Sequence, residues 1–448
     1  MSSPSRSSAS QDTGPAEVAQ QTGAASGNSS ARGLLAVRIF GCLAAGYFMS
    51  YGLRSVNAVL APELSADLGL SNAQLGSLSS AYFLAFALMQ LPLGVWLDRF
   101  GPRRVNAVLM ALAGLGCACF AMSQTVSQLW FARALIGLGV SAGLMASLTA
   151  FRQWFDPSLQ TRLAAWMLMA GTSGVLTATV PVHRALPLLG WRGVFWACAL
   201  LLALIAVLMW TVMPRGREQG AASAPAGATV APASAPLSFL ASMAGYGAVF
   251  RNGYFWRMSM TAGIVQGGFV AMQSLWVGPW LNRVLGFTGE AGADRLFLFN
   301  LGLLLAFLGL GVVAPRVPAE RAALARIVAW GTLAVVVFEV VIALNTEPGR
   351  WWLWIVFATA ATVYTLVQPR VGLAFPPELA GRALTGFNLV IFSWMFFSQW
   401  GFGVAIDLIR NAGVAEAEAF RRALLGLAGI HGLCLMVFVG WPKRWGGR

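Results

Sequence analysis

Long apolar stretches separated by short polar turns follow one another from residue 34 onward, and this pattern sets the fold class. They occupy 35–60, 72–97, 104–123, 127–151, 161–182 and 191–213, then 256–281, 293–315, 322–345, 351–373, 383–408 and 420–441. A bilayer core about 30 Å thick is crossed by a helix of about 20 mostly apolar residues. The pattern predicts an all-α membrane protein with 12 transmembrane helices in two six-helix bundles.

Two low-complexity stretches rich in Ala, Ser and Pro or Gly divide the chain into domains. Residues 1–33 have the composition of a disordered cytoplasmic tail. Residues 214–250 have the composition of a flexible cytoplasmic linker. The expected six-helix bundles are residues 34–213 and 251–441, followed by a cytoplasmic tail at 442–448.

Composition excludes a soluble domain, because only 10% of the residues are charged against roughly 25% in soluble proteins. The formal charge of +14 does not indicate nucleic-acid binding, because the number of basic residues per loop alternates between high and low along the chain. Cytoplasmic loops hold the excess of Arg and Lys, which places both termini in the cytoplasm. Scarce Lys beside abundant Arg, Ala and Gly indicates a bacterium, and therefore its inner membrane.

Chemistry-bearing residues are too few for an enzyme. All five Cys lie in apolar stretches without a CxxC pair, and there are two His. No zinc spacing, nucleotide-binding GxxxxGK[ST] motif or Ser-His-Asp set can be assembled from the chain. We therefore expect no catalytic residues, no metal and no cofactor, and no nucleic acid as a partner.

The turn GVWLDRFGPRR, between the second and third stretches, carries the most specific motif. It resembles the loop signature of the major facilitator superfamily. LWFARALIGLG from Leu129 and GWRGVFW from Gly190 resemble the same family's fourth-helix and sixth-helix patterns. The resemblance implies a gating motif of Gly94, Asp98, Arg99, Gly101, Arg103 and Arg104, in which Gly94 lets two helices approach closely and Asp98 faces a helix start. The alternative is a charged turn that only sets topology.

The same resemblance implies a central site lined by the first, fourth, seventh and tenth helices. These spans contain no Asp or Glu, yet the first holds Arg54 and the fourth holds Arg133. Because a guanidinium can grip a carboxylate or phosphate through two hydrogen bonds, we expect an anionic substrate. The alternatives are that Arg54 snorkels to the outer surface and that Arg133 bridges helices. The candidate substrate-binding residues are Arg54, Asn57, Gln266, Gln273, Trp276, Tyr364 and Gln368.

Two residues are candidates for coupling. Arg133 begins the R-x-x-x-G-x-G pattern that the family associates with proton coupling, although Ile136 departs from the family's pattern. Glu339 lies deep in the ninth apolar stretch, where an ionisable side chain is a candidate proton relay or has a structural partner.

These features together predict a monomeric secondary transporter that moves a small organic anion with protons by alternating access. Two alternatives stay open at this point. One is an efflux pump of the same family for a drug or metabolite, and the other is a membrane sensor that binds a solute.

Overall fold

The computed structural model describes residues 15–214 and 246–440, apart from residue 319. All of its regular elements within those ranges are helices. The first half comprises α1 (Pro15–Ser55), α2 (Asn57–Leu68), α3 (Asn72–Met122), α4 (Val126–Val140), α5 (Gly143–Trp154), α6 (Pro157–Thr177) and α7 (Val180–Val212). The predicted linker lies largely outside the described residues, as does the tail at 442–448.

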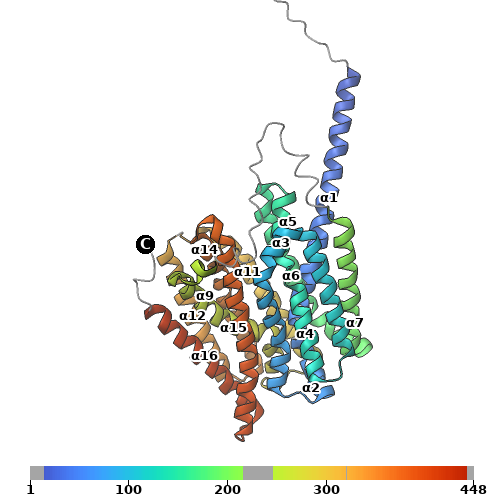
Figure 1. Cartoon of the computed structure of the whole chain (residues 1–448). Coiled ribbons are helices and arrows are strands. Elements are labelled where there is room, and N and C mark those ends of the chain that lie inside the picture. The colour runs from blue at the N-terminus through green and yellow to red at the C-terminus, as the bar shows by residue number, and fades with distance from the viewer. Residues whose placement is uncertain (1–14, 215–245, 319, 441–448) are drawn as a thin grey trace, which may run out of the picture.

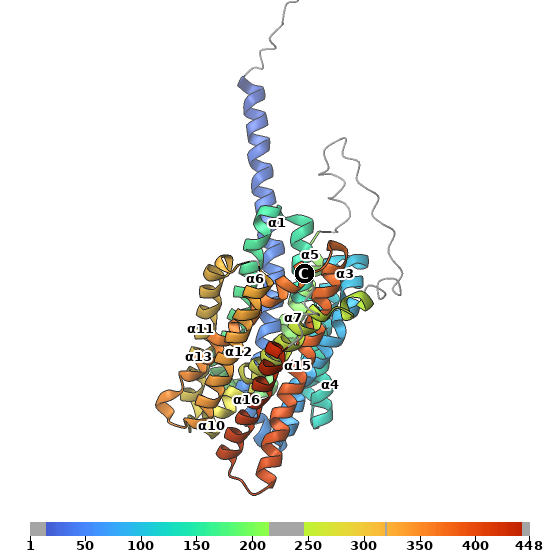
Figure 2. The ribbon, with the colours of Figure 1, turned by 90° about the vertical axis from the view of Figure 1, so that its left-hand side faces the viewer.

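The second half begins with a seventh crossing that is interrupted by a π-helix. Its elements are α9 (Gly253–Ala271), η1 (Met272–Trp276), α10 (Val277–Arg283), α11 (Gly289–Val313), η2 (Ala314–Arg316), α12 (Arg321–Leu344), η3 (Pro348–Arg350), α13 (Leu353–Ala361), η4 (Thr362–Leu366), α14 (Val367–Leu373), α15 (Pro377–Asn411) and α16 (Glu416–Gly440). Figures 1 and 2 show these helices as two neighbouring bundles.

Ten helices of the described chain are long and apolar enough to cross a membrane. The other two crossings are α6 and the run α9–η1–α10. The predicted all-α architecture of twelve helices is therefore confirmed. Some predicted spans join in one element: α3 holds the second and third, which meet at Gly101 with φ 75°. Only glycine adopts that conformation readily, so the chain reverses there.

The first crossing differs from its prediction at both ends. α1 begins at Pro15, inside the stretch predicted to be disordered, and Ala and Gln in that stretch are good helix formers. At the other end the predicted span 35–60 is not one continuous helix, because α1 stops at Ser55 and α2 starts at Asn57. This break lies next to Arg54 and Asn57, two of the candidate substrate-binding residues.

The two halves pack together along α3 and α15 (Figure 1). Near the middle of this contact the rings of Phe86 and Phe392 stack with centroids 4.0 Å apart. Toward α2, the backbones approach so closely that a Cβ added to Gly76 would lie 2.7 Å from the carbonyl oxygen of Gln399. We call this side the α2 end. The opposite side, where α5 and α14 end, is the α5 end (Figure 1).

Candidate functional site

At the α2 end, a carboxylate of the second half caps a helix of the first. Asp407 accepts hydrogen bonds from the backbone N–H of Asn72 at 3.3 Å and of Ala73 at 2.7 Å, and from the Asn72 side chain at 2.9 Å. These are the first two residues of α3, whose unsatisfied N–H groups and dipole favour an anion. Closing the α2 end therefore satisfies polar groups on both halves.

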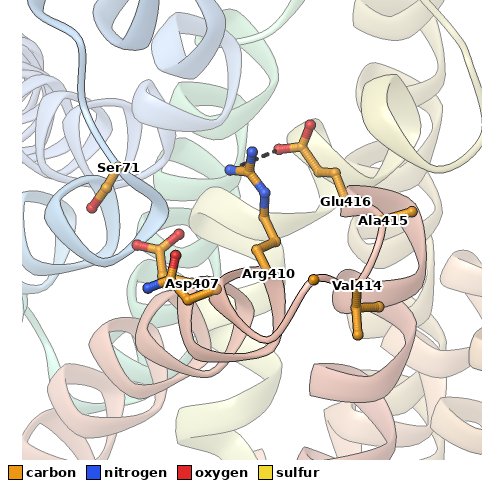
Figure 3. A pocket seen from close by; sticks show the side chains of 8 residues that line it. Ser71, Asp407, Arg410, Val414, Ala415 and Glu416 are labelled. Carbon is orange, nitrogen blue, oxygen red and sulfur yellow. Dashed lines mark ion pairs between the residues drawn. The ribbon is translucent and has the colours of Figure 1, made fainter.

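A second cross-half contact lies beside this cap. The Arg283 guanidinium donates to Asn72 Oδ1 at 2.8 Å and forms an ion pair with Glu416 at 2.7 Å. Arg410 approaches the same Glu416 carboxylate at 3.8 Å, as Figure 3 shows. Asn72, Ala73, Arg283, Asp407 and Glu416 form what we call the α2-end latch. Ser71, Asp407, Arg410 and Glu416 also line a pocket of about 730 Å³.

The predicted gating motif lies at the α5 end, in the turn of α3. Arg103 donates through Nε to the Trp210 carbonyl at 2.9 Å, which ties the turn to the last residues of α7. Arg99 lies over the Phe100 ring, and Arg104 is exposed. The side chain of Asp98 lies outside the described residues, so its predicted contact with a helix start stays a prediction.

The close helix approach expected at Gly94 is wrong for this conformation, because a Cβ added there would meet nothing within 4 Å. Both halves meet tightly at the α2 end instead. Among the side chains that the structure describes, cross-half hydrogen bonds include the latch, the pair of Arg184 with Glu290 at 2.9 Å and the contact of Asn388 with Gln90 at 3.4 Å. The conformation is therefore closed at the α2 end.

Arg54 and Arg133 lie together at the break between α1 and α2. Arg133 is fully buried and donates to the carbonyl oxygens of Leu53 at 2.6 Å and Arg54 at 3.5 Å. It thus satisfies carbonyls that the end of α1 leaves without helical partners, and a cation at a helix C-terminus is favourable. This contact matches the helix-bridging interpretation of Arg133, and its role in coupling stays a prediction.

The Arg54 guanidinium stacks 3.9 Å from the centroid of the Tyr51 ring, and its Nε is buried without a hydrogen-bond partner. Tyr51 in turn accepts a hydrogen bond from Tyr47. Throughout the described ranges, neither Arg54 nor Arg133 has a carboxylate within 4.0 Å. Two guanidinium groups therefore share this region of the first half without an acidic partner there.

The other predicted substrate residues divide into packed and half-buried side chains. Asn57 is buried and donates to Ser79 at 2.7 Å. Gln273 donates to Asn300 at 3.2 Å, and Trp276 donates to the Gln399 carbonyl at 3.1 Å. Tyr364 is fully buried and shares a hydrogen bond with Thr332. Each of the four therefore has a hydrogen-bond partner within the fold, and their role in substrate binding stays a prediction.

Gln266 and Gln368 are half-buried, as Arg54 is. Gln368 donates to Asn388 of α15 at 2.8 Å, and Asn388 donates to Gln90 of α3 at 3.4 Å. This chain of amides crosses between the halves near the stacked phenylalanines. Sequence reasoning missed Gln90 and Asn388 because they lie in the second and eleventh spans, although polar residues inside apolar stretches could have identified them.

Glu339 has a partner that the sequence did not indicate. Its Oε2 lies 2.9 Å from Nδ1 of His431 on α16, and both side chains have no exposed surface. The two residues are far apart in the chain, so only the packing of α12 against α16 brings them together.

The fold and the site together identify the class of protein, a multi-pass helical membrane protein with two bundles that close on one side. A model of the Major Facilitator Superfamily matches residues 43–399, and the chain belongs to that family. The fold is also similar to a crystal structure of a bacterial homolog to the human lysosomal transporter Spinster, with TM-score 0.70, 17% identity and coverage of 89% of this chain and 95% of that one. The crystal structure of the D-xylose-proton symporter is similar with TM-score 0.69 and 15% identity, and the match covers 90% of this chain and 96% of that one.

Among curated relatives, the probable L-galactonate transporter of Escherichia coli is 29% identical over 47% of each chain. The probable sulfoacetate transporter SauU of Cupriavidus necator is 31% identical over 35% of this chain and 36% of its own. The gallate transporter of Pseudomonas putida is 30% identical over 38% of each. The chain spans about half the length of the first relative and less of the others. These relatives and structural neighbours are transporters.

Proposed function

We propose that this protein is a secondary transporter that moves a small organic anion across a bacterial inner membrane, coupled to protons. L-galactonate, sulfoacetate and gallate, named for three relatives, are all small carboxylates or sulfonates. Their shared chemistry is a compact negative charge on a polar or aromatic body. This is the substrate class that the proposal takes for the present chain.

The observation that carries the proposal is that Arg54 has no acidic partner among the described residues. A charged side chain inside a span costs about 2.5–3.5 kcal/mol or more unless it is paired. An anion bound at Arg54 would supply the missing partner through charge-assisted hydrogen bonds. The neighbouring Tyr51 and Tyr47 offer hydroxyl groups and aromatic faces for the rest of such a substrate.

Alternating access is supported by the latch at the α2 end. Its contacts are polar and join two rigid bundles, so they can break and re-form as the halves rock against each other. The Arg-rich turns of the α5 end favour a cytoplasmic position for that end. On this orientation the latch closes the periplasmic side, and substrate leaves Arg54 toward the cytoplasm.

The test is uptake of radiolabelled L-galactonate, gallate and sulfoacetate into proteoliposomes with an imposed proton gradient. We expect one of these anions to accumulate, and Arg54→Gln to raise its KM by about tenfold to hundredfold, as expected for loss of a hydrogen bond to a charged group. Arg350→Gln is the matched control, because Arg350 is an exposed partner of Glu347 in η3. Equal KM values in Arg54→Gln and wild type would rule out anion binding at Arg54.

A further inference from the structure

Glu339 and His431 form a pair of titratable side chains in the second half, and neither side chain has exposed surface. His431 contacts two helices at once: Nδ1 lies 2.9 Å from Glu339 on α12, and Nε2 lies 3.3 Å from the Ile264 carbonyl oxygen on α9. The ring can approach α9 because residue 268 is glycine. A Cβ there would lie 2.5 Å from His431 Nε2.

The two contacts can both be hydrogen bonds only when the pair carries a particular number of protons. The Ile264 carbonyl only accepts, so Nε2 must hold a hydrogen to bond it. Nδ1 then either donates to the Glu339 carboxylate as part of an imidazolium or accepts from a protonated Glu339 carboxyl. In both arrangements the pair holds one proton more than a carboxylate beside a neutral imidazole.

Loss of that proton breaks one of the two contacts. A neutral imidazole has a single N–H, which can face either Glu339 or Ile264, and the other ring nitrogen then points a lone pair at an oxygen. The Glu339 carboxylate would also become an unpaired charge in a buried site, where its cost is high. Oε1 of Glu339 already lacks a hydrogen-bond partner, so it adds nothing to offset the loss.

The surroundings offer no second charge to compensate. Among the described residues, no Arg or Lys pairs with Glu339, and the nearest basic group on α9, Arg257, donates to the Phe438 carbonyl at 3.1 Å. The helices α13 and α15 present aromatic side chains to α9. Among the described residues, Tyr364 of η4 interacts with Glu339, and Cys434 of α16 interacts with Tyr364.

The contact lies on the same helix run as two features of the proposed site. Ile264 lies two residues before Gln266, a predicted substrate-binding residue, and eight residues before the π-helix Met272–Trp276. A π-helix is a common place for a helix to change shape at a functional site. A change at Ile264 would therefore act on the helix that carries Gln266 and leads into the π-helix.

We propose that the Glu339–His431 pair holds the coupled proton, and that its proton ties α16 to both α9 and α12. With the proton bound, both contacts form and α9 is held; without it, α9 or α12 is released. This inference rests on the proposed proton-coupled transport for its role, but the proton site itself can be measured without any substrate.

The first experiment follows the proton directly by ¹⁵N NMR of histidine-labelled, full-length protein in lipid. The chain has only two His, so the His183→Gln background leaves His431 as the sole labelled ring. We expect the His431 ring signals to be those of a ring that shares a proton with Glu339, and to change when that proton is lost as the pH is raised. Glu339→Gln should abolish this change. Signals that do not change with pH, or that change identically in Glu339→Gln, would overturn the proton site.

The second experiment separates coupling from transport. For an anion shown to be transported, Glu339→Gln and His431→Gln should lower pH-driven accumulation by about tenfold, because the free energy that couples proton binding to anion transport is lost. Anion counterflow, which needs no proton gradient, should stay nearly unchanged. Glu347→Gln removes an exposed carboxylate immediately before η3 and should change neither. If no anion is transported, the proposed function fails while the NMR result still stands. Full pH-driven accumulation in both pair variants would overturn the coupling role.

Discussion

The Asp407 carboxylate accepts a hydrogen bond from the backbone N–H of Ala73 at 2.7 Å, so α15 of the second half caps α3 of the first. Helix capping normally joins residues that are close in sequence. Here it joins residues from the two halves of the chain, and the cap exists only while the α2 end is closed. The energy of this helix cap thus contributes to the equilibrium between the closed and the open state of the α2 end.

Replacing Asp407 by Asn should shift that equilibrium toward the open state by about 1 kcal/mol, because an amide interacts less favourably with the positive start of α3. Double electron–electron resonance would measure the distance between spin labels at Ala66 and Ala412, which are both exposed at the α2 end. We expect a larger fraction of long distances. Glu418→Gln is the control, since Glu418 pairs with Arg421 and Arg422 of its own helix. A distance distribution unchanged from wild type would show that the cap does not hold this end closed.

Gly278→Ala should prevent closure more strongly. An added Cβ would overlap the carbonyl oxygen of Ala58 in the other half, and backbone cannot move aside as a side chain can. We expect spin labels at the α2 end to report an open population and uptake to fall by about tenfold or more. Gly429→Ala adds the same methyl group to α16 where nothing lies within 4 Å, and it should behave as wild type. Normal uptake by Gly278→Ala would contradict the closed geometry.

Arg133→Gln should destabilise the first half. The guanidinium bonds the Leu53 carbonyl at 2.6 Å, and loss of a buried charged hydrogen bond costs about 1.5–3 kcal/mol. A lower midpoint of thermal unfolding in detergent would reveal this cost. Arg162→Gln serves as the comparison, because Arg162 lies over the exposed ring of Trp166. Equal midpoints for Arg133→Gln and wild type would show that α1 ends without help from Arg133.

Acid should weaken the link between α2 and α7. Hydrogen bonds from Arg192 and Trp191 hold the pKa of Asp67 below its ordinary value of 3.8. Because the pKa of Asp67 is lower in the folded protein than in the unfolded one, the ionised carboxylate stabilises the fold at any pH above the unfolded-state pKa. That stabilisation is lost as the pH falls through the folded-state pKa. The unfolding midpoint of wild type should therefore fall more than that of Asp67→Asn when pH is lowered past about 4. Parallel pH profiles of the two proteins would disprove this link.

The sequence alone determined the twelve crossings, their approximate ends and the family. It could do so because a bilayer demands about 20 apolar residues per helix and because the turn at Gly94–Arg104 keeps a family motif within one short segment. It also identified Arg54 and Arg133, since a charge inside an apolar stretch is visible without any knowledge of packing.

Only the tertiary structure decided which of these residues meet. Glu339 has the same sequence context whether or not His431 lies beside it, and Asp407 reads as an ordinary charge near a helix end until Ala73 is placed against it. Local patterns report how a segment interacts with its solvent, because apolar length and periodicity are properties of the segment itself. Contacts between distant helices depend on how whole bundles pack, and the partners of buried polar groups are therefore set by the fold rather than by spacing.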